Sequence, residues 1–268
     1  MMNKIVALFM GLAFWGCSEV AVTGRKQMNL LPNSMMTEMG LSNYSAYLTE
    51  NKKAIITTGP EVELVKKVGN KIAQSVTSYL TQNGLGKQAA EFKWEFNVVK
   101  DDTTVNAWCM PGGKVVVYTG LLPVAKTEAG LAVVMGHEIA HAVANHGNER
   151  MSQGLLAQFG TIALDMATVK TDPKIKNIFM TSVGMGTQLG ILLPFSRLQE
   201  SESDKMGLIF MAMSGYDPNE AVTFWGRMAA ASGGQAPPQF LSTHPSSDKR
   251  AADLKAYIPE AMKYYVKP

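Results

Sequence analysis

The spacing of apolar residues along the chain predicts a protein built mainly of helices. Apolar side chains recur at helical intervals over residues 34–54 and again over 60–82. Pro60 suits the first position of the second helix, because the backbone N–H of a residue there has no helical partner in any case. The sequence NGLG at 83–86 then ends this helix.

Two stretches rich in β-branched and aromatic residues follow. FKWEFNVVK at 92–100 alternates apolar and polar residues, and GKVVVYTGLL at 113–122 contains three successive valines. Both patterns are typical of strands. The segment between them, DDTTVNAWCMPGG at 101–113, ends in Pro and Gly residues, which predict a turn.

Capping residues mark the starts of two later helices. Thr127 is a suitable cap for a helix that we expect to reach about Asn145. Ser196, followed three places on by Gln199, forms a capping box. We expect the helix that it starts to run to about Ser214.

The C-terminal part of the chain predicts further helices. In the sequence DPNE we expect Asp217 to cap a helix, Pro218 to take its first position and Glu220 to reach back to the cap. SGGQAPPQ at 232–239 predicts a linker or flexible loop, and a short helix begins near Ser246. Many helices and few strands together predict a predominantly α-helical α+β fold with a small β-sheet.

Composition and charge narrow the class of protein. With 46% hydrophobic and 18% charged residues in a chain of 268, disorder is excluded as the main state. The formal net charge is only +3, and no run of Lys and Arg with interleaved aromatic residues marks a nucleic-acid surface. We therefore expect no nucleic-acid partner.

The N-terminus has the pattern of a secretory signal. One Lys precedes an apolar run at 5–16, which is shorter than the roughly 18 residues that a membrane-spanning helix needs. Ending in FWGC, the run resembles a bacterial lipoprotein signal, in which Cys17 would become the lipidated first residue of the mature chain. Phe14 stands where Leu is usual, so an uncleaved or conventionally cleaved signal is the alternative. In the lipoprotein pattern, Ser18 favours sorting to the outer membrane.

Thiol chemistry is not expected in this protein. Cys109 is the one other cysteine, so a lipidated Cys17 leaves no intramolecular disulfide. Its neighbours in VNAWCMPGG are apolar, which favours a buried structural thiol over a nucleophile.

The stretch VVMGHEIAHAVANH at 133–146 carries the candidate chemistry. His137 and His141 are four residues apart, so they share one helical face, and Glu138 lies beside that face. This is the H-E-x-x-H pattern of zinc hydrolases. The flanking residues are apolar nearly all round, and polar groups in an interior helix need a cation or a dense hydrogen-bond network. We expect His146 to be a hydrogen-bonded histidine just beyond the ligand face.

A catalytic zinc takes a third protein ligand and keeps a fourth position for water. The helix SRLQESESDKMG offers Glu200 and Asp204, which are four residues apart and share a face. One of these carboxylates can bind the metal while the other accepts a hydrogen bond from a metal-bound imidazole. Glu202 is a nearby competitor.

Four blocks in the same order resemble the gluzincin metallopeptidase family that contains HtpX, the CaaX prenyl proteases, and the soluble periplasmic proteins BepA and LoiP. The blocks are VNAWCMPGGKVVVYTGLL, HEIAHAVANHGNER, SRLQESESDKMG and STHPSSDKR, and they cover roughly residues 101–250. The chain lacks the several spanning helices of HtpX and the prenyl proteases, so it resembles the BepA and LoiP type more closely. Ser203 replaces the more common Ala, a small departure.

This resemblance implies a role for each residue of the motif. His137, His141 and Glu200 would bind one zinc ion, Glu138 would act as general base, and Asp204 would hydrogen-bond a zinc-bound histidine. A water activated by zinc would attack the scissile carbonyl as Glu138 takes its proton.

The resemblance also implies a zincin-like sheet whose edge strand flanks the active-site helix. The strand in GGKVVVYTG would be that edge strand, so a polypeptide substrate would lie along Val115, Val116 and Val117 by β-addition. Two residues are candidates to stabilise the transition state, namely His244 in THP and Arg250. Alternatively, His244 occupies the open zinc position as a latch, as the resemblance to BepA suggests, or it is a surface histidine with no role in the site.

The segment IFMTSVGMGTQLGILLP at 178–194 has no charged residue, but it is short for a membrane span. Gly186 and Gly190, four residues apart, would let it pack closely against neighbours. We expect a packed or lid-forming helical hairpin over the cleft, with peripheral membrane contact as the alternative.

The sequence thus predicts a signal peptide at 1–17, an extended lead-in at 18–33 and a zinc metallopeptidase domain at 34–268. We expect an endopeptidase that is lipid-anchored in a bacterial envelope, at the periplasmic face of the outer membrane, and that cleaves misfolded or misassembled envelope proteins. The first alternative is an envelope assembly factor or chaperone whose zinc site is latched by His244 and hydrolyses little. The second is a zinc hydrolase that acts on small amides or esters.

Overall fold

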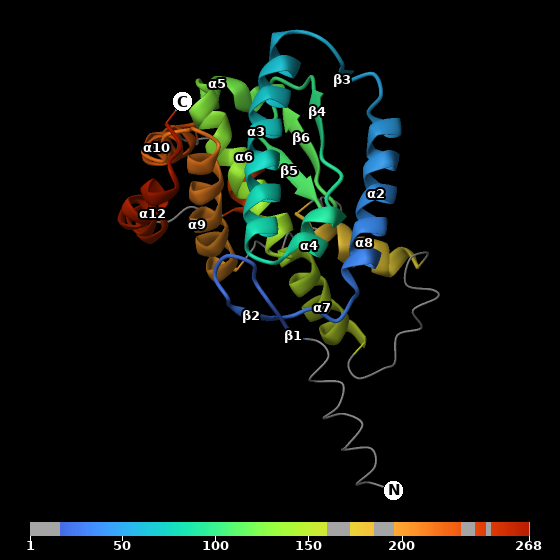
Figure 1. Cartoon of the computed structure of the whole chain (residues 1–268). Coiled ribbons are helices and arrows are strands. Elements are labelled where there is room, and N and C mark those ends of the chain that lie inside the picture. The colour runs from blue at the N-terminus through green and yellow to red at the C-terminus, as the bar shows by residue number, and fades with distance from the viewer. Residues whose placement is uncertain (1–16, 160–171, 185–195, 232–238, 245–247, 268) are drawn as a thin grey trace, which may run out of the picture.

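The computed structural model describes residues 17–159, 172–184, 196–231, 239–244 and 248–267 (Figure 1). The predicted apolar run at 5–16 lies outside the described residues. So do most of the predicted linker at 232–239, the expected helix start at Ser246, and the later part of the apolar segment 178–194.

The described residues form an α+β fold that is mostly helical, as the sequence predicted. The main helices are α2 (Asn33–Glu50), α3 (Pro60–Gln82), α6 (Glu128–Val143), α7 (His146–Phe159), α8 (Pro173–Ser182), α9 (Arg197–Met213), α10 (Glu220–Ala230) and α12 (Asp248–Ala261). Shorter helical segments are α4 (Gly86–Glu91), α5 (Leu122–Ala125), α11 (Gln239–Thr243) and the two 3-10 turns Thr119–Leu121 and Met262–Tyr264. The strands are β1 (Cys17–Glu19), β2 (Lys26–Met28), β3 (Ile55–Ile56), β4 (Glu95–Val99), β5 (Ala107–Met110) and β6 (Lys114–Tyr118).

Four strands form the sheet beside the site, in the order β3-β4-β6-β5. β6 pairs with β4 in parallel and with β5 antiparallel, so it lies inside the sheet. The prediction that Val115, Val116 and Val117 form an edge strand is therefore wrong. Both sides of β6 already carry a hydrogen-bonded neighbour, and the edge strand next to it is β5.

β5 itself was missed in the sequence. Its four residues, Ala107–Met110, lie in the segment that predicted only a turn, and all four are buried. A strand of four residues covered on both faces shows no alternation of apolar and polar positions, so periodicity cannot detect it. The predicted turn does follow it, because Gly112 and Gly113 both have positive φ, at 85° and 83°.

The two faces of the sheet pack against different helices. Val115 and Val117 belong to the main core, which also contains residues of α3, α6 and α9. Val116 and Trp108 face the other way, where Tyr44 of α2 packs against them. Figure 1 shows α2 separated from α3 and α6 by the sheet.

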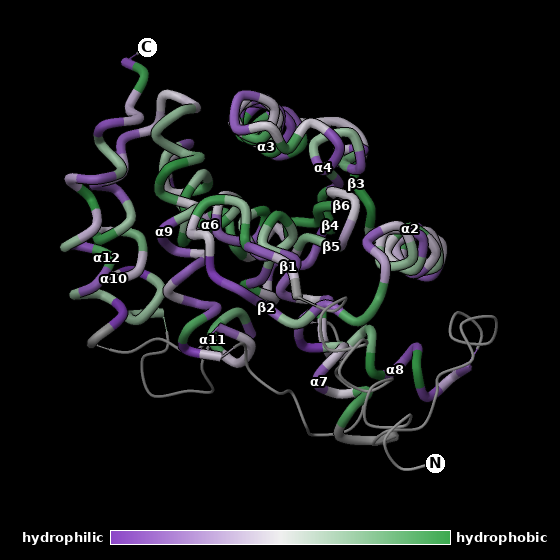
Figure 2. The backbone as a smooth tube through the Cα atoms, turned by 60° about the horizontal axis from the view of Figure 1, so that its bottom comes forward, coloured by the Kyte–Doolittle hydropathy of each residue, from purple (hydrophilic) through white to green (hydrophobic). Residues whose placement is uncertain are grey.

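α6 lies at the centre of the molecule. It contacts α3, β5, α9 and α10, and every residue from Gly130 to Val143 is buried. Figure 2 shows α6 between the sheet and α9, with α10 and α12 farther out. The interior position that the apolar flanks predicted is therefore confirmed.

Local capping signals set the starts of both helices that carry the motif residues. The Thr127 side chain accepts a hydrogen bond from Gly130 N at 3.0 Å, and α6 begins at the next residue. Ser196 and Gln199 form both hydrogen bonds of the predicted capping box at the start of α9. These predictions are confirmed.

The predicted start of the next helix is wrong. α10 begins at Glu220, two residues later than expected, because the Asp217 side chain binds Asn219 N in a turn that precedes the helix. Glu220 does not reach back to a cap, and its carboxylate lies 2.7 Å from Arg227 Nη2.

The segment expected to be an extended lead-in contains the hairpin β1–β2, in which Cys17 pairs with Met28. Val20, in the connecting turn, is buried in the main core. Within the described part of the chain, no helix combines the length and apolar character that a membrane span requires.

Candidate active site

Four side chains converge on one buried point. His137 and His141 lie one turn apart on α6, and Glu200 lies in the first turn of α9. His244 directly follows α11. One ligand atom from each of the four lies within 4.8 Å of the other three. Among the described residues, these four side chains form the cluster of His, Cys, Asp or Glu whose geometry suits a metal ion.

The two imidazoles on α6 face each other and Glu200. His137 Nε2 lies 3.1 Å from His141 Nε2. The Glu200 carboxylate oxygens lie 3.5 Å from His137 Nε2 and 3.3 Å from His141 Nε2. The structure thus brings together the three residues that the sequence proposed as ligands, although they come from helices about 60 residues apart.

Asp204 and Arg250 support this cluster from behind. Asp204 Oδ1 lies 2.9 Å from His137 Nδ1, and Arg250 binds both Asp204 oxygens, at 2.5 and 2.8 Å. Arg250 Nη1 also lies 2.6 Å from Glu200 Oε2, and its guanidinium stacks over the Trp225 ring, with 4.2 Å from Cζ to the ring centroid. Arg250 is therefore an internal counter-ion of the carboxylates. Its expected role as a transition-state donor stays a prediction.

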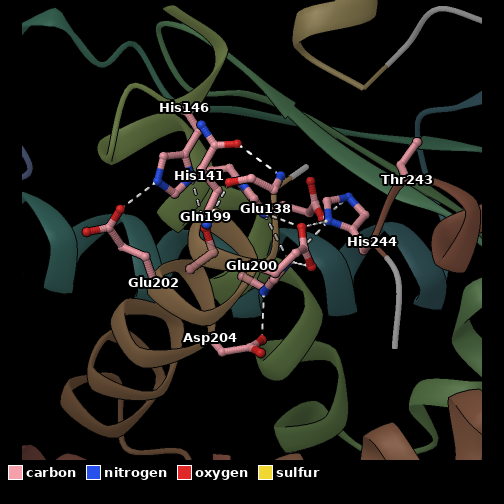
Figure 3. Close-up of polar contacts among 12 residues, drawn as sticks. Glu138, His141, His146, Gln199, Glu200, Glu202, Asp204, Thr243 and His244 are labelled. Atoms are coloured by element: carbon pink, nitrogen blue, oxygen red, sulfur yellow. Dashed lines mark hydrogen bonds and ion pairs between the residues drawn. The ribbon is translucent and has the colours of Figure 1, made fainter. Parts of the chain in front are cut away.

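His146 supports the second imidazole. His146 Nδ1 lies 2.9 Å from His141 Nδ1, and its Nε2 lies 2.9 Å from Glu202 Oε2. Figure 3 shows Glu202 on the far side of the cluster from His244, with its carboxylate directed at His146. Glu202 thus does not compete with Glu200 for the cluster. His146 is hydrogen-bonded, as expected, but its contact with His141 was not foreseen.

His244 occupies the fourth position of the cluster. Its Nδ1 lies 3.2 Å from His137 Nε2 and 2.9 Å from Glu200 Oε1, while its Nε2 lies 3.3 Å from Glu138 Oε1. The ring stacks on Phe240, with 4.5 Å between centroids. This places His244 where a catalytic zinc keeps its exchangeable ligand.

The carboxylates and imidazoles differ in the charge that their surroundings favour. Burial raises the pKa of Glu200, but His244, Arg250 and His137 outweigh it and hold this pKa well below its usual range. Burial lowers the pKa of His141 well below its usual range. An ionised carboxylate and a neutral imidazole are the forms that bind a metal.

His137 and Glu138 respond to different features of the site, namely the nearby carboxylates and burial. Burial lowers the pKa of His137, yet the Glu200 and Asp204 carboxylates outweigh it and raise this pKa to about 9. Burial also raises the pKa of Glu138. Its Oε1 is fully buried, and His244 Nε2 lies 3.3 Å from it. A divalent cation at this point would take the place of the His137 proton as the positive charge beside the Glu200 and Asp204 carboxylates.

The donor set fits one zinc ion. A catalytic zinc site takes ligands such as two imidazole nitrogens and one carboxylate, and here three side chains place such ligands within reach of a single point. His244 or water would be the fourth group. Asp204 orients His137 in the manner of the carboxylate partners of zinc-bound histidines.

A pocket lies beside the cluster, between β5 and the helices α2 and α8. Its lining includes Glu138 and His141 of α6, Cys109 of β5, Met36 of α2, and Val183, which follows α8. Burial raises the pKa of the Cys109 thiol well above its usual value, which agrees with the expected structural role. α8 begins at Pro173, and the Val183 that follows it closes one wall of the pocket.

The fold and this site define a zincin-like metallopeptidase. The chain belongs to peptidase family M48, whose family model matches residues 67–258. The family inferred from the four sequence blocks is thus confirmed at the level of an M48 metallopeptidase.

Three relatives show the range of similarity. The chain is 41% identical over 174 residues to the mitochondrial metalloendopeptidase OMA1 of Schizosaccharomyces pombe, covering 64% of this chain and 49% of that protein. It is 28% identical over 280 residues to the protein of the same name from Saccharomyces cerevisiae, covering 99% of this chain and 78% of that protein. It is 26% identical over 230 residues to the β-barrel assembly-enhancing protease of Escherichia coli, covering 83% of this chain and 44% of that protein. The chain spans about half the length of most of these relatives.

Proposed function

We propose that this protein is a zinc-dependent endopeptidase with Glu138 as its general base. The observation that carries the proposal is the convergence of His137, His141 and Glu200, with the Glu138 carboxylate buried beside them. Zinc, when bound, lowers the pKa of a coordinated water toward neutrality and polarises the scissile carbonyl.

The residues of the chain would perform the proton transfers. The raised pKa of Glu138 suits a carboxylate that takes a proton from water and passes it to the leaving amine. Asp204 would keep the proton of His137 on Nδ1, so that its Nε2 stays free to bind the ion. Arg250 would hold Asp204 and Glu200 in place by its ion pairs with both.

A polypeptide substrate would lie along β5 as an added strand. β5 is the edge of the sheet on the side of α6, and its Cys109 lines the same pocket as Glu138 and His141. Extended chains add to a free strand edge through their backbone, with little demand on side-chain identity, and because all four residues of β5 are buried, this edge would have to be uncovered first. Such binding suits an enzyme that cleaves unfolded polypeptides.

We propose that His244 acts as a latch on this site. His244 belongs to the four-residue cluster, its Nδ1 lies 2.9 Å from Glu200 Oε1, and its Nε2 faces the general base. If this ring binds the ion, it would exclude water and a substrate carbonyl from the fourth position. The same contact supports a second candidate function, an envelope assembly factor or chaperone in which the latch rarely opens.

The proposed location is the periplasmic face of a bacterial outer membrane, with Cys17 as a lipid anchor. Its support is the resemblance of residues 1–17 to a lipoprotein signal. The proposed substrates are misfolded or misassembled envelope proteins. The bacterial relative named as a β-barrel assembly-enhancing protease supports this choice, whereas the mitochondrial relatives carry the peptidase domain in another compartment.

The decisive test is cleavage of unfolded casein by the purified protein, with zinc content measured in the same sample. We expect cleavage that a chelator abolishes and added zinc restores. Zinc-loaded protein that cleaves neither casein nor peptides, even when His244 is replaced by Ala, would overturn the endopeptidase proposal and favour the chaperone. Turnover confined to small amides or esters would indicate a different hydrolase.

A further inference from the structure

Arg25 ties the N-terminal hairpin to two helices beside the site. Its Nε donates to Glu202 Oε2 at 2.8 Å, and its Nη1 and Nη2 donate to the two oxygens of Glu149, each at 2.8 Å. The Arg25 side chain is only 19% exposed, and those of Glu149 and Glu202 are 10% and 4% exposed. Paired, largely buried contacts of this kind are stronger and more directional than ion pairs on the surface.

The rest of the N-terminal segment contacts the same helices. Gln27 Nε2 donates to Ala144 O at 2.7 Å. Ala144 caps the C-terminal end of α6, so this hydrogen bond joins the N-terminal segment to that helix end. Asn148 on α7 donates to Leu31 O at 2.8 Å. The segment therefore packs onto the end of the motif helix and onto the helix that follows it.

The chain turns sharply between these two helices. Asn145 has φ of 57°, in the left-handed region that Asn tolerates at a helix end. α7 begins at the next residue, His146, so this ring returns toward His141 on the preceding helix. A ring that reaches a neighbouring ligand in this way can control its orientation.

The contacts from Glu202 through His146 to His141 show which ring nitrogen carries each proton, starting from the Glu202 carboxylate. The Glu202 carboxylate accepts only, so His146 Nε2 carries a proton and donates to it. A neutral His146 then has an acceptor at Nδ1, and His141 Nδ1–H donates to it. This leaves His141 Nε2 without a proton, facing His137 and Glu200. The tautomer follows from the network of contacts.

The other motif histidine has a parallel arrangement. His137 Nδ1 binds Asp204 of α9, and Asp204 is held by Arg250. Each histidine of the H-E-x-x-H motif is thus backed by a carboxylate of α9, and each carboxylate is held by an arginine from another part of the chain. For His141 the arginine is Arg25, and His146 bridges the extra distance.

We propose that Arg25 is a positioning residue of the metal centre, because it holds Glu202 against His146 and thereby keeps His141 in the orientation and tautomer that bind the ion. The inference rests on the proposed zinc site. It gives the residues at 18–33, which the sequence predicted only as a lead-in, a part in metal retention.

The test measures zinc affinity by competition with a coloured chelator. It compares the wild-type full chain with its Arg25→Met and Arg25→Lys variants. Loss of a partner that orients a metal ligand typically weakens metal binding about 10- to 100-fold. We expect about tenfold weaker binding for Arg25→Met and partial recovery for Arg25→Lys. The visible absorption bands of the cobalt-substituted protein, which report ligand geometry, should also shift in Arg25→Met.

Arg227→Met is the matched control. Arg227 also pairs with a glutamate, Glu220, at 2.7 Å, and its side chain is 18% exposed. The control should lose comparable thermal stability, yet keep its zinc affinity within about twofold and its cobalt spectrum unchanged. Equal zinc affinities and spectra for Arg25→Met and Arg227→Met would overturn the proposal.

A second variant keeps the test valid if Arg25→Met does not fold. Glu202→Gln preserves the shape of the side chain and removes the charge that holds Arg25 and His146 together. It should weaken zinc binding in the same direction, and unchanged affinity would count against the proposal. A wild-type chain that binds no zinc would instead overturn the proposed function itself, so the two failures are distinguishable.

Discussion

Gly136 on α6 and Gly207 on α9 meet backbone to backbone. A Cβ added to Gly207 would lie 2.9 Å from His137 N and 3.0 Å from Gly136 C, while one added to Gly136 would lie 3.0 Å from Gly207 O. Only glycine allows two helices to approach so closely. This approach lets Glu200 and Asp204 on α9 reach the imidazole of His137 on α6.

Gly207→Ala should separate the two zinc helices. The added methyl group meets backbone atoms, which cannot move aside, so we expect a loss of about 1–3 kcal/mol in the free energy of unfolding. Zinc affinity should fall as well, because α9 carries Glu200. Gly226→Ala on α10 is the control, since its Cβ meets nothing within 4 Å. Urea unfolding and chelator competition measure both effects, and a Gly207→Ala variant as stable as the control would contradict the role of this contact.

Glu138→Gln should abolish cleavage without loss of zinc. Removing a general base lowers the rate by about 100-fold or more, while the ligands His137, His141 and Glu200 remain in place. Casein cleavage and zinc content of the same preparation make the measurement. Glu128→Gln, at the start of the same helix and paired with Lys67, should retain activity. Residual cleavage above one-tenth of wild type in Glu138→Gln would indicate a different base.

His244→Ala should increase cleavage if the ring is a latch. An enzyme whose open state is populated about 10–30% of the time gains about three- to tenfold when the closed state is removed. Thr243→Ala, at the neighbouring buried position, controls for disturbance of α11. A fall in kcat for His244→Ala with Thr243→Ala unaffected would assign His244 to transition-state stabilisation instead.

Acid should destabilise the protein through Glu202. Burial alone would raise the pKa of Glu202, but hydrogen bonds from His146, Thr23 and Arg25 outweigh it and lower this pKa to about 2. Because the folded pKa lies below the unfolded value of about 4.3, the stabilisation is complete above that unfolded value and is lost as the pH falls toward 2. Unfolding of the protein in chelator at pH 6, 4 and 3 should show a steeper loss for wild type than for Glu202→Gln. Parallel curves would exclude this contribution.

Cys17→Ala should release the protein from membranes if Cys17 is lipidated. In bacterial cells given a radioactive or alkyne-labelled fatty acid, we expect label on the wild type and none on Cys17→Ala. Cys109→Ala is the control, since Cys109 is buried and far in sequence from the signal. Membrane association that survives in an unlabelled Cys17→Ala variant would show that the anchor lies elsewhere.

Features carried by short stretches of sequence were predicted well. Thr127 and the Ser196–Gln199 capping box start their helices where expected, because a cap depends on residues within one turn. The predicted bounds of the helix at 60–82 also agree with those of α3. The start of α10 was misjudged, since the Asp217 turn and the pairing of Glu220 with Arg227 compete with the expected cap.

Features that depend on distant partners were missed or misassigned. The strand β5 has no periodicity of its own and exists because β6 pairs with it. The placement of Val116 inside the sheet follows from that pairing. Likewise, nothing in the local sequence indicates that Arg25 lies beside Glu202, which is 177 residues away.

The sequence by itself determined that His137 and His141 share a face of a buried helix and that Glu200 and Asp204 share a face of another, since helical spacing alone sets which side chains neighbour each other. Only the tertiary structure decided which carboxylate joins the imidazoles, that His244 fills the fourth position, and that Arg25 and His146 support His141. These choices depend on how closely α6 and α9 approach and on where the N-terminal segment packs, and such distances are set by the fit of whole surfaces.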